Sequence, residues 1–153
     1  MADPAGRIQR LIADPTAESF DVLALDTFRY QHAENAAYRA WCDGLGVNPG
    51  DVTSPGGIPA VPVAAFKELD FVCGSPGAEF RTSGTTGTGR GRHLMPSLEV
   101  YQAASLAWFR ACLMPEGWRL RTLILAPPPD RRPHSSLSAM LGWILEAHGE
   151  PGS

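Results

Sequence analysis

The sequence has few cysteines and histidines, and neither residue type is spaced as a disulfide framework or a metal site would require. The three cysteines, Cys42, Cys73 and Cys112, include no CxxC pair, and an odd number cannot all pair with one another. The four histidines lack the spacing of three or four residues that places two ligands on one face of a helix. We therefore expect reduced thiols and no metal centre.

An excess of positive charge and long apolar runs are also missing. The 13 Lys and Arg against 16 Asp and Glu give a formal net charge of -3, without the basic surplus of a nucleic-acid-binding protein. No apolar run approaches the roughly 20 residues that span a bilayer, and the first ten residues lack the apolar core of a secretion signal. We therefore expect no nucleic-acid partner, no membrane span and a cytoplasmic location.

What the sequence does contain is typical of a folded domain with long loops. It has 153 residues, of which 44% are hydrophobic and 19% charged, and its 16 Gly and 14 Pro gather in a few stretches. The order of elements predicts a single partial domain over 1–153. It consists of a helical segment over 1–46, a Pro/Gly-rich connector over 47–78, and a strand, phosphate loop, helix, strand and helix over 79–153.

Apolar spacing predicts the helices of the first segment. The pattern over residues 7–13 predicts a short helix. Aspartate is a common helix cap and proline is common at the first helical position, so Asp14 and Pro15 predict the start of the next helix. A helical pattern then runs from 20 to 45 with a break at 32–35. The pattern is therefore compatible with one long helix or with two consecutive helices.

The second half of the chain reads as an α/β arrangement. A brief helix over 63–72 and a short strand over 79–82 precede the loop. Ser97 is expected to cap a helix that Pro115 ends, and Trp108 and Cys112 on its apolar face are expected in the core.

The remaining elements complete that order. The run RTLILA, residues 121–126, has the length and apolar character of a buried strand. Ser135 or Ser136 is expected to cap a last helix that ends at Gly149. With two candidate strands, the predicted sheet is incomplete.

The stretch from Arg81 to Arg92, RTSGTTGTGRGR, carries the clearest chemical signal. Its glycines allow successive backbone N–H groups to approach an anion, and its hydroxyl groups add further hydrogen-bond donors. Arg90 and Arg92 add positive charge in a planar fork that suits phosphate. The spacing fits neither the GxxxxGK[ST] loop nor the GxGxxG fingerprint. The composition predicts a polyphosphate-binding loop of another kind.

Residues 82–87, TSGTTG, are identical to a common form of the phosphate loop of adenylate-forming enzymes, the superfamily of acyl-CoA synthetases, luciferases and adenylation domains. Ahead of the loop, residues 58–67, IPAVPVAAFK, resemble the IPxxPxxxFK segment of LuxE-like acyl-protein synthetases. Residues 135–140 and 28–38 resemble two further stretches of that family. The matches occur in the same order over nearly the whole chain.

The resemblance implies that this chain corresponds to the start of the large α/β domain of such enzymes. The implied reaction is the activation of a long-chain fatty acid by ATP, with Mg²⁺, to an acyl-adenylate, followed by transfer to a protein thiol, for example that of a reductase. No catalytic residue is assigned. The residues implied to bind the phosphates are Thr82, Ser83, Gly84, Thr85, Thr86, Gly87 and Arg90.

The sequence also departs from the family pattern. Gly89-Arg90 stands where many superfamily members have Pro-Lys, and Cys42, Cys73 and Cys112 match no acyl-accepting cysteine. The resemblance covers only the N-terminal portion of the family, without its adenine and ribose site, later acidic motif or small C-terminal domain. Two alternatives therefore stay open: a non-catalytic remnant or interaction module, and a fragment of an enzyme that transfers acyl or aryl groups to coenzyme A.

Overall fold

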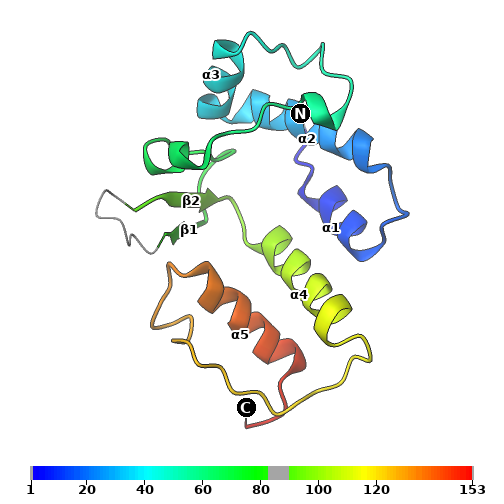
Figure 1. The fold of residues 1–153 in the computed structure, drawn as a ribbon, viewed down its shortest axis with the longest axis vertical. Helices are drawn as coiled ribbons and strands as arrows, with labels where there is room; N and C mark the ends of the chain where they lie inside the picture. The colour runs from blue at the N-terminus through cyan, green and yellow to red at the C-terminus, as the bar shows by residue number, and fades with distance from the viewer. Residues whose placement is uncertain (1, 83–89, 153) are drawn as a thin grey trace. The chain divides into compact units, whose positions relative to one another are not determined.

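A computed structural model describes residues 2–82 and 90–152, and within them the fold is mixed α/β (Figure 1). Residue contacts divide the chain into two units, Met1–Ser97 and Leu98–Ser153, and each is described by itself. Among the described residues, the first unit holds three α-helices, two 3₁₀ turns and a two-stranded sheet, and the second holds two α-helices. The helical bounds are α1 (Ala5–Ala13), α2 (Phe20–Glu34), α3 (Ala36–Gly44), α4 (Glu99–Leu113) and α5 (Ser136–His148).

The predicted break at 32–35 is confirmed, and it separates two helices. Asn35 ends α2 and begins α3, and its side-chain oxygen accepts a hydrogen bond from the backbone N–H of Tyr38 at 3.0 Å. Asparagine suits this position because its short side chain satisfies a donor of the first turn that has no partner within the helix. The chain therefore changes direction between the two helices at Asn35 alone.

The prediction that a helix starts at Asp14 and Pro15 is wrong. The Asp14 carboxylate accepts hydrogen bonds from the backbone N–H and the hydroxyl of Thr16, at 2.9 and 2.7 Å, and α2 begins only at Phe20. Aspartate forms such local bonds in turns as readily as at helix starts, and the sequence pattern does not distinguish the two.

The core of the first unit lies between α2, α3 and the connector. Phe28 and Cys42 are fully buried, and the Phe28 and Tyr38 rings meet edge to face with centroids 6.0 Å apart. Val52 of the connector joins this cluster, and Ile58 and Val61 pack against it. The connector is irregular apart from two 3₁₀ turns, η1 (Pro55–Gly57) and η2 (Val63–Lys67). Its apolar residues thus fix the path of the chain toward the strands.

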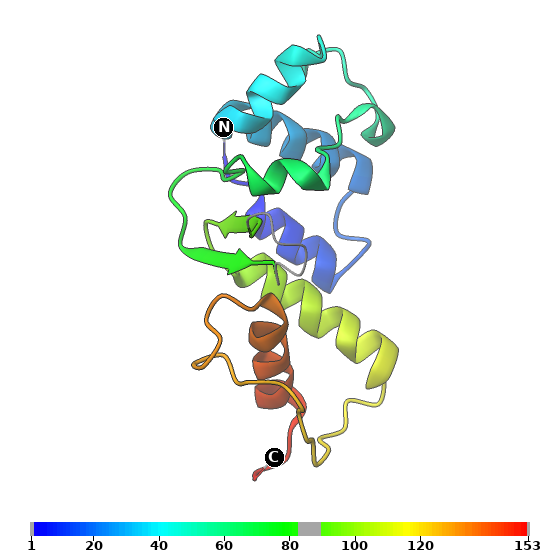
Figure 2. The same cartoon turned by 60° about the vertical axis from the view of Figure 1, so that its left-hand side comes forward.

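The sheet of the first unit is a hairpin of β1 (Ala78–Arg81) and β2 (Arg92–Met95), which run antiparallel (Figure 2). The pairs run from Ala78 with Met95 to Arg81 with Arg92. The sequence predicted the first strand but placed no strand directly after the loop. The four residues RHLM are too short for alternation to reveal, and only pairing with β1 makes them a strand.

The second unit is built on the pair of α4 and α5. The rings of Tyr101 and Trp143 meet edge to face at 5.3 Å, and the Tyr101 hydroxyl donates to the carbonyl oxygen of Ser136 at 3.2 Å. The predicted cap of the last helix is confirmed, since the Ser135 hydroxyl oxygen accepts from the N–H of Ser138 at 3.2 Å. At the start of α4, Leu98 occupies the N-cap position that was predicted for Ser97.

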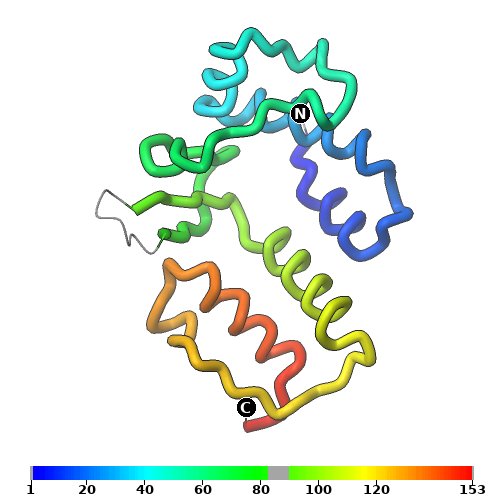
Figure 3. Tube along the Cα trace, viewed as in Figure 1, coloured from blue at the N-terminus to red at the C-terminus, as the bar shows by residue number. Residues whose placement is uncertain are grey.

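The prediction that 121–126 is a buried strand is wrong. These residues form no strand, and the tube in Figure 3 runs irregularly beside α5. A short parallel bridge forms next to them, where Leu120 exchanges hydrogen bonds with His148 and Glu150. Leu123 and Leu125 are 85% and 93% exposed. A strand requires a neighbour for its backbone groups, and composition alone cannot supply one.

Two residues of α4 also differ from expectation. Trp108 is 73% exposed and Cys112 is exposed, although their spacing predicted a shared buried face. Helical spacing fixes which residues share a face, but only a packing partner can bury that face.

Candidate functional site

The predicted phosphate loop connects β1 to β2, so both of its ends belong to the hairpin. Of the residues predicted to bind phosphate, Thr82 and Arg90 are described, and both are exposed. The other predicted residues, Ser83, Gly84, Thr85, Thr86 and Gly87, lie outside the described residues. The candidate site is therefore built from the base of the loop.

Two hydrogen bonds close this base. The N–H of Thr82 donates to the carbonyl oxygen of Gly91 at 3.0 Å, and the N–H of Gly91 donates to the Thr82 hydroxyl oxygen, also at 3.0 Å. The second bond uses the threonine oxygen as an acceptor, and a hydroxyl that accepts keeps its own proton for donation. Thr82 therefore holds the loop closed and still offers a donor to a ligand.

Glycines permit close approaches at both ends of the hairpin. A Cβ at Gly77 would lie 2.3 Å from the carbonyl oxygen of Pro96, so a side chain there is excluded. A Cβ at buried Gly91 would meet the Phe66 carbonyl oxygen and the Thr82 methyl group at 3.4 Å and Lys67 Cγ at 3.6 Å. Residues 66 and 67 thus pack directly on the base of the loop.

An aromatic contact secures this packing. The Phe66 ring stacks on half-buried His93 of β2 with centroids 4.8 Å apart, and it contacts Phe71 with centroids 4.9 Å apart. The ring of half-buried His93 is therefore part of the packing at the base of the loop. Phe66 is the aromatic residue of the IPxxPxxxFK-like segment. The structure therefore brings the IPxxPxxxFK-like segment against the base of the loop.

The same segment is anchored to the helical core. The Tyr38 hydroxyl of α3 donates to the carbonyl oxygen of Pro59 at 2.9 Å. Burial, with a smaller contribution from neighbouring Cys42, raises the pKa of Tyr38 to about 12, so the phenol stays protonated as a donor at neutral pH. A chain of contacts thus runs from α3 through Pro59 and Phe66 to the base of the loop.

The cations around the loop fall into two groups. Arg92 forms an ion pair with Asp70, and its Nη2 lies 2.7 Å from both carboxylate oxygens. Arg81 forms an ion pair with Glu79 at 2.7 Å, and the hydrogen bond between them raises the pKa of Arg81. Lys67 and Arg90 form no ion pair with any residue that the structure describes. The charges available to an anion at the base are therefore those of Lys67 and Arg90.

Sequence reasoning missed Lys67, Gly91 and the second strand. Lys67 is exposed, as most lysines are, so its residue type alone does not single it out. Its position next to Phe66 within the IPxxPxxxFK-like segment was the one signal that could have singled it out. The contact itself spans more than twenty residues of sequence, which no local pattern encodes.

Elsewhere in 2–82 and 90–152, no three His, Cys, Asp or Glu side chains gather as ligands for a metal ion. None of the helices described there is long and apolar enough to cross a membrane. The thiol of buried Cys42 has a raised pKa because burial disfavours its thiolate, which argues against a nucleophilic role.

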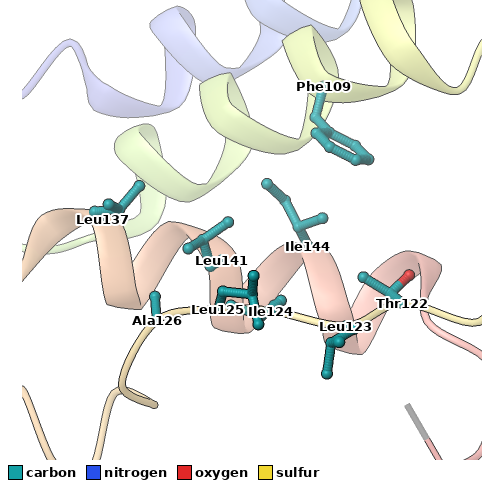
Figure 4. Close-up of a pocket in the computed structure, with 9 residues that line it drawn as sticks. All are labelled: Phe109, Thr122, Leu123, Ile124, Leu125, Ala126, Leu137, Leu141 and Ile144. Atoms are coloured by element: carbon teal, nitrogen blue, oxygen red, sulfur yellow. The ribbon is translucent and has the colours of Figure 1, made fainter.

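The second unit contains an open hollow of about 380 Å³ (Figure 4). Phe109 of α4 and Leu141 and Ile144 of α5 point into it, opposite residues 122–126. Its lining is apolar apart from Thr122, so it lacks the charged donors that a phosphate group requires. The hollow is therefore suited to an apolar group and not to the phosphate proposed for the base of the loop.

No protein-family model matches this chain, and neither a curated protein nor a solved structure matches it. The resemblance to acyl-protein synthetases accordingly rests on the sequence motifs named above.

Proposed function

We propose that this chain binds the phosphates of ATP through the TSGTTG loop and activates a long-chain fatty acid as an acyl-adenylate for transfer to a protein thiol. In this proposal it corresponds to the start of the large layered α/β domain of LuxE-like acyl-protein synthetases. The observation that carries the proposal is that the loop motif and the IPxxPxxxFK-like segment, which are separate in sequence, pack together at the Thr82–Gly91 pair.

The chemistry at the base of the loop fits a polyphosphate. Thr82 offers a hydroxyl donor, and the exposed side chains of Lys67 and Arg90 offer charges that no described carboxylate neutralises. Reactions at phosphates depend mainly on positioning and on stabilisation of charge, which such groups provide as pyrophosphate departs. Mg²⁺ would enter with ATP, since this ion is commonly held by phosphate oxygens and water with few protein ligands.

The proposal is tested by two measurements on the purified chain: the affinity for ATP, and the exchange of labelled pyrophosphate into ATP that depends on a fatty acid. We expect both, and we expect Thr85→Ala and Gly87→Val to abolish exchange by removing a donor and a backbone approach to phosphate. Gly56→Val is the matched control, because a Cβ at Gly56 meets no atom within 4 Å. A folded chain that binds no ATP would refute the proposal.

The acceptor distinguishes the two enzymatic possibilities. If the acyl group passes to a protein thiol, release of AMP by the chain will not respond to added coenzyme A. Stimulation by coenzyme A would instead place the chain in the branch of acyl-CoA or aryl-CoA ligases.

A second candidate function is a non-catalytic interaction module. It is favoured by the exposure of Leu123 and Leu125 beside the apolar hollow, because exposed apolar groups next to a groove are typical of surfaces that bind another polypeptide segment. Affinity for ATP without any exchange of pyrophosphate would favour this candidate over the enzyme.

A further inference from the structure

We propose that Lys67 is a phosphate-binding residue of this site, acting from outside the loop. The inference rests on the proposed function, since it concerns the nucleotide that the TSGTTG loop would bind. It starts from a property of the sequence: Lys67 is the single lysine among the 13 basic residues of this chain.

The geometry places this lysine at the loop base. Its Cγ lies 3.6 Å from the point where a Cβ would stand at Gly91. The side chain therefore passes over the residue that closes the loop with Thr82. Because Gly91 has no side chain, the lysine stem can lie against its backbone, and a Cβ built at Gly91 would also lie 3.4 Å from the Thr82 methyl group. A larger residue at 91 would crowd that stem.

The position of residue 67 is fixed on both sides. Phe66 is held in a stack with His93 and Phe71, and η2 contacts β2. The stem of Lys67 therefore begins from a well-defined backbone position, while its ammonium group is carried toward solvent. A cation mounted in this way loses less conformational freedom on binding than one on an unsupported loop.

The neighbouring charges leave Lys67 available. Asp70 is engaged by Arg92 and Glu79 by Arg81, and exposed Glu68, which follows Lys67 in the chain, forms no ion pair with it among the described residues. Lys67 from η2 and Arg90, which precedes Gly91 in the chain, would then both supply positive charge to a polyphosphate at the base of the loop. A lysine supplies a compact point charge with three donors, which complements the planar fork of an arginine.

The single lysine permits a chemical test. Pyridoxal 5′-phosphate condenses with an amine, with loss of water, and borohydride reduces the resulting imine to a stable adduct. In the whole chain the targets are Lys67 and the α-amino group of the N-terminus, which serves as an internal control. We expect ATP and tripolyphosphate to lower the labelling of Lys67 at least fivefold. Adenosine, which has no phosphate, should not lower the labelling of Lys67. None of the three compounds should lower the labelling of the N-terminus.

Substitution gives an independent readout. Loss of one charged contact to phosphate is expected to weaken ATP binding by about tenfold in Lys67→Met. Lys67→Arg should recover most of the affinity, because it keeps the positive charge. Arg10→Met, which removes an exposed charge from α1, is the matched control and should leave the affinity within a factor of two.

The outcomes separate this inference from the proposed function. If Thr85→Ala weakens ATP binding while Lys67→Met does not, and ATP fails to protect Lys67 from labelling, the role of Lys67 is refuted and the loop remains the phosphate site. If the unaltered chain binds no ATP, the proposed function fails and this inference fails with it. Circular dichroism of Lys67→Met checks that the exposed substitution leaves the fold unchanged.

Discussion

The two units of this chain differ in how completely their apolar residues are covered. In the first unit, Phe28 and Cys42 have 1% and 0% of their surface exposed, and the connector packs on them. In the second unit, Trp108, Leu123 and Leu125 are exposed by 73% or more. The candidate phosphate site belongs to the first unit, which buries more of the described apolar residues than the second, although Val63 of η2 is itself 82% exposed. A site that must hold several donors in place benefits from this rigid support, which exposed helices cannot provide.

The contrast is expected to be largest for core truncations. Phe28→Ala should lower the free energy of unfolding of the first unit by about 3–5 kcal/mol, because it leaves a cavity among fully buried neighbours. Ile144→Ala in α5 should cost about 2 kcal/mol, since the open hollow beside it offers fewer contacts to lose. Amide hydrogen exchange, followed separately in 20–44 and 136–148, measures both. Equal losses would contradict the comparison.

Replacing the helix-capping residues of the two units should lower the free energy of unfolding by intermediate amounts. Asn35→Ala should cost about 2 kcal/mol and Ser135→Ala about 0.5 kcal/mol, the two ends of the range for such caps. The difference arises because Asn35 is buried, so the N–H of Tyr38 would lose its partner away from water, whereas Ser135 is only half-buried. Urea unfolding of the two variants, compared with the unaltered chain, provides the measurement. A larger loss for Ser135→Ala would reverse the order that burial predicts.

The smallest effect is expected from pH. Arg7 of α1 hydrogen-bonds to Glu18 and Asp26, and these bonds hold the pKa of both carboxyl groups below their usual values. Their contribution to stability is therefore fully present above the pKa values of the unfolded chain, near pH 4, and is lost as the pH falls through the lower folded values.

Because these groups are solvent-accessible, the loss should be modest. It is measured as the urea midpoint of the first unit between pH 7 and pH 3. Arg7→Met should flatten this dependence, and an unchanged pH profile in that variant would show that the ion pairs do not contribute.

Local chemistry made several features of the chain predictable from sequence. The break between α2 and α3 follows from Asn35, whose side chain can end one helix and cap the next. The cap of α5 by Ser135 was predictable for the same reason. Asp14 was assigned wrongly because an aspartate in a turn and one at a helix start form similar bonds.

The candidate site was predictable only in part. The TSGTTG loop and the IPxxPxxxFK-like segment are visible in the sequence, because glycine and hydroxyl residues at these spacings are chemically distinctive. Their meeting at Gly91 was not, since it depends on the stacking of Phe66 on His93 across more than twenty residues. The role we propose for Lys67 follows from that contact.

The sequence by itself therefore determined the elements whose causes are local: α1 and its neighbours, the caps, the Pro/Gly-rich connector and the composition of the loop. Tertiary structure decided which apolar residues are covered and which cations remain without a carboxylate partner. RTLILA has the composition of a buried strand, yet Leu123 and Leu125 stay exposed in the absence of a described neighbour to accept its backbone hydrogen bonds. Burial and pairing are properties of two segments at once, and for that reason neither segment alone encodes them.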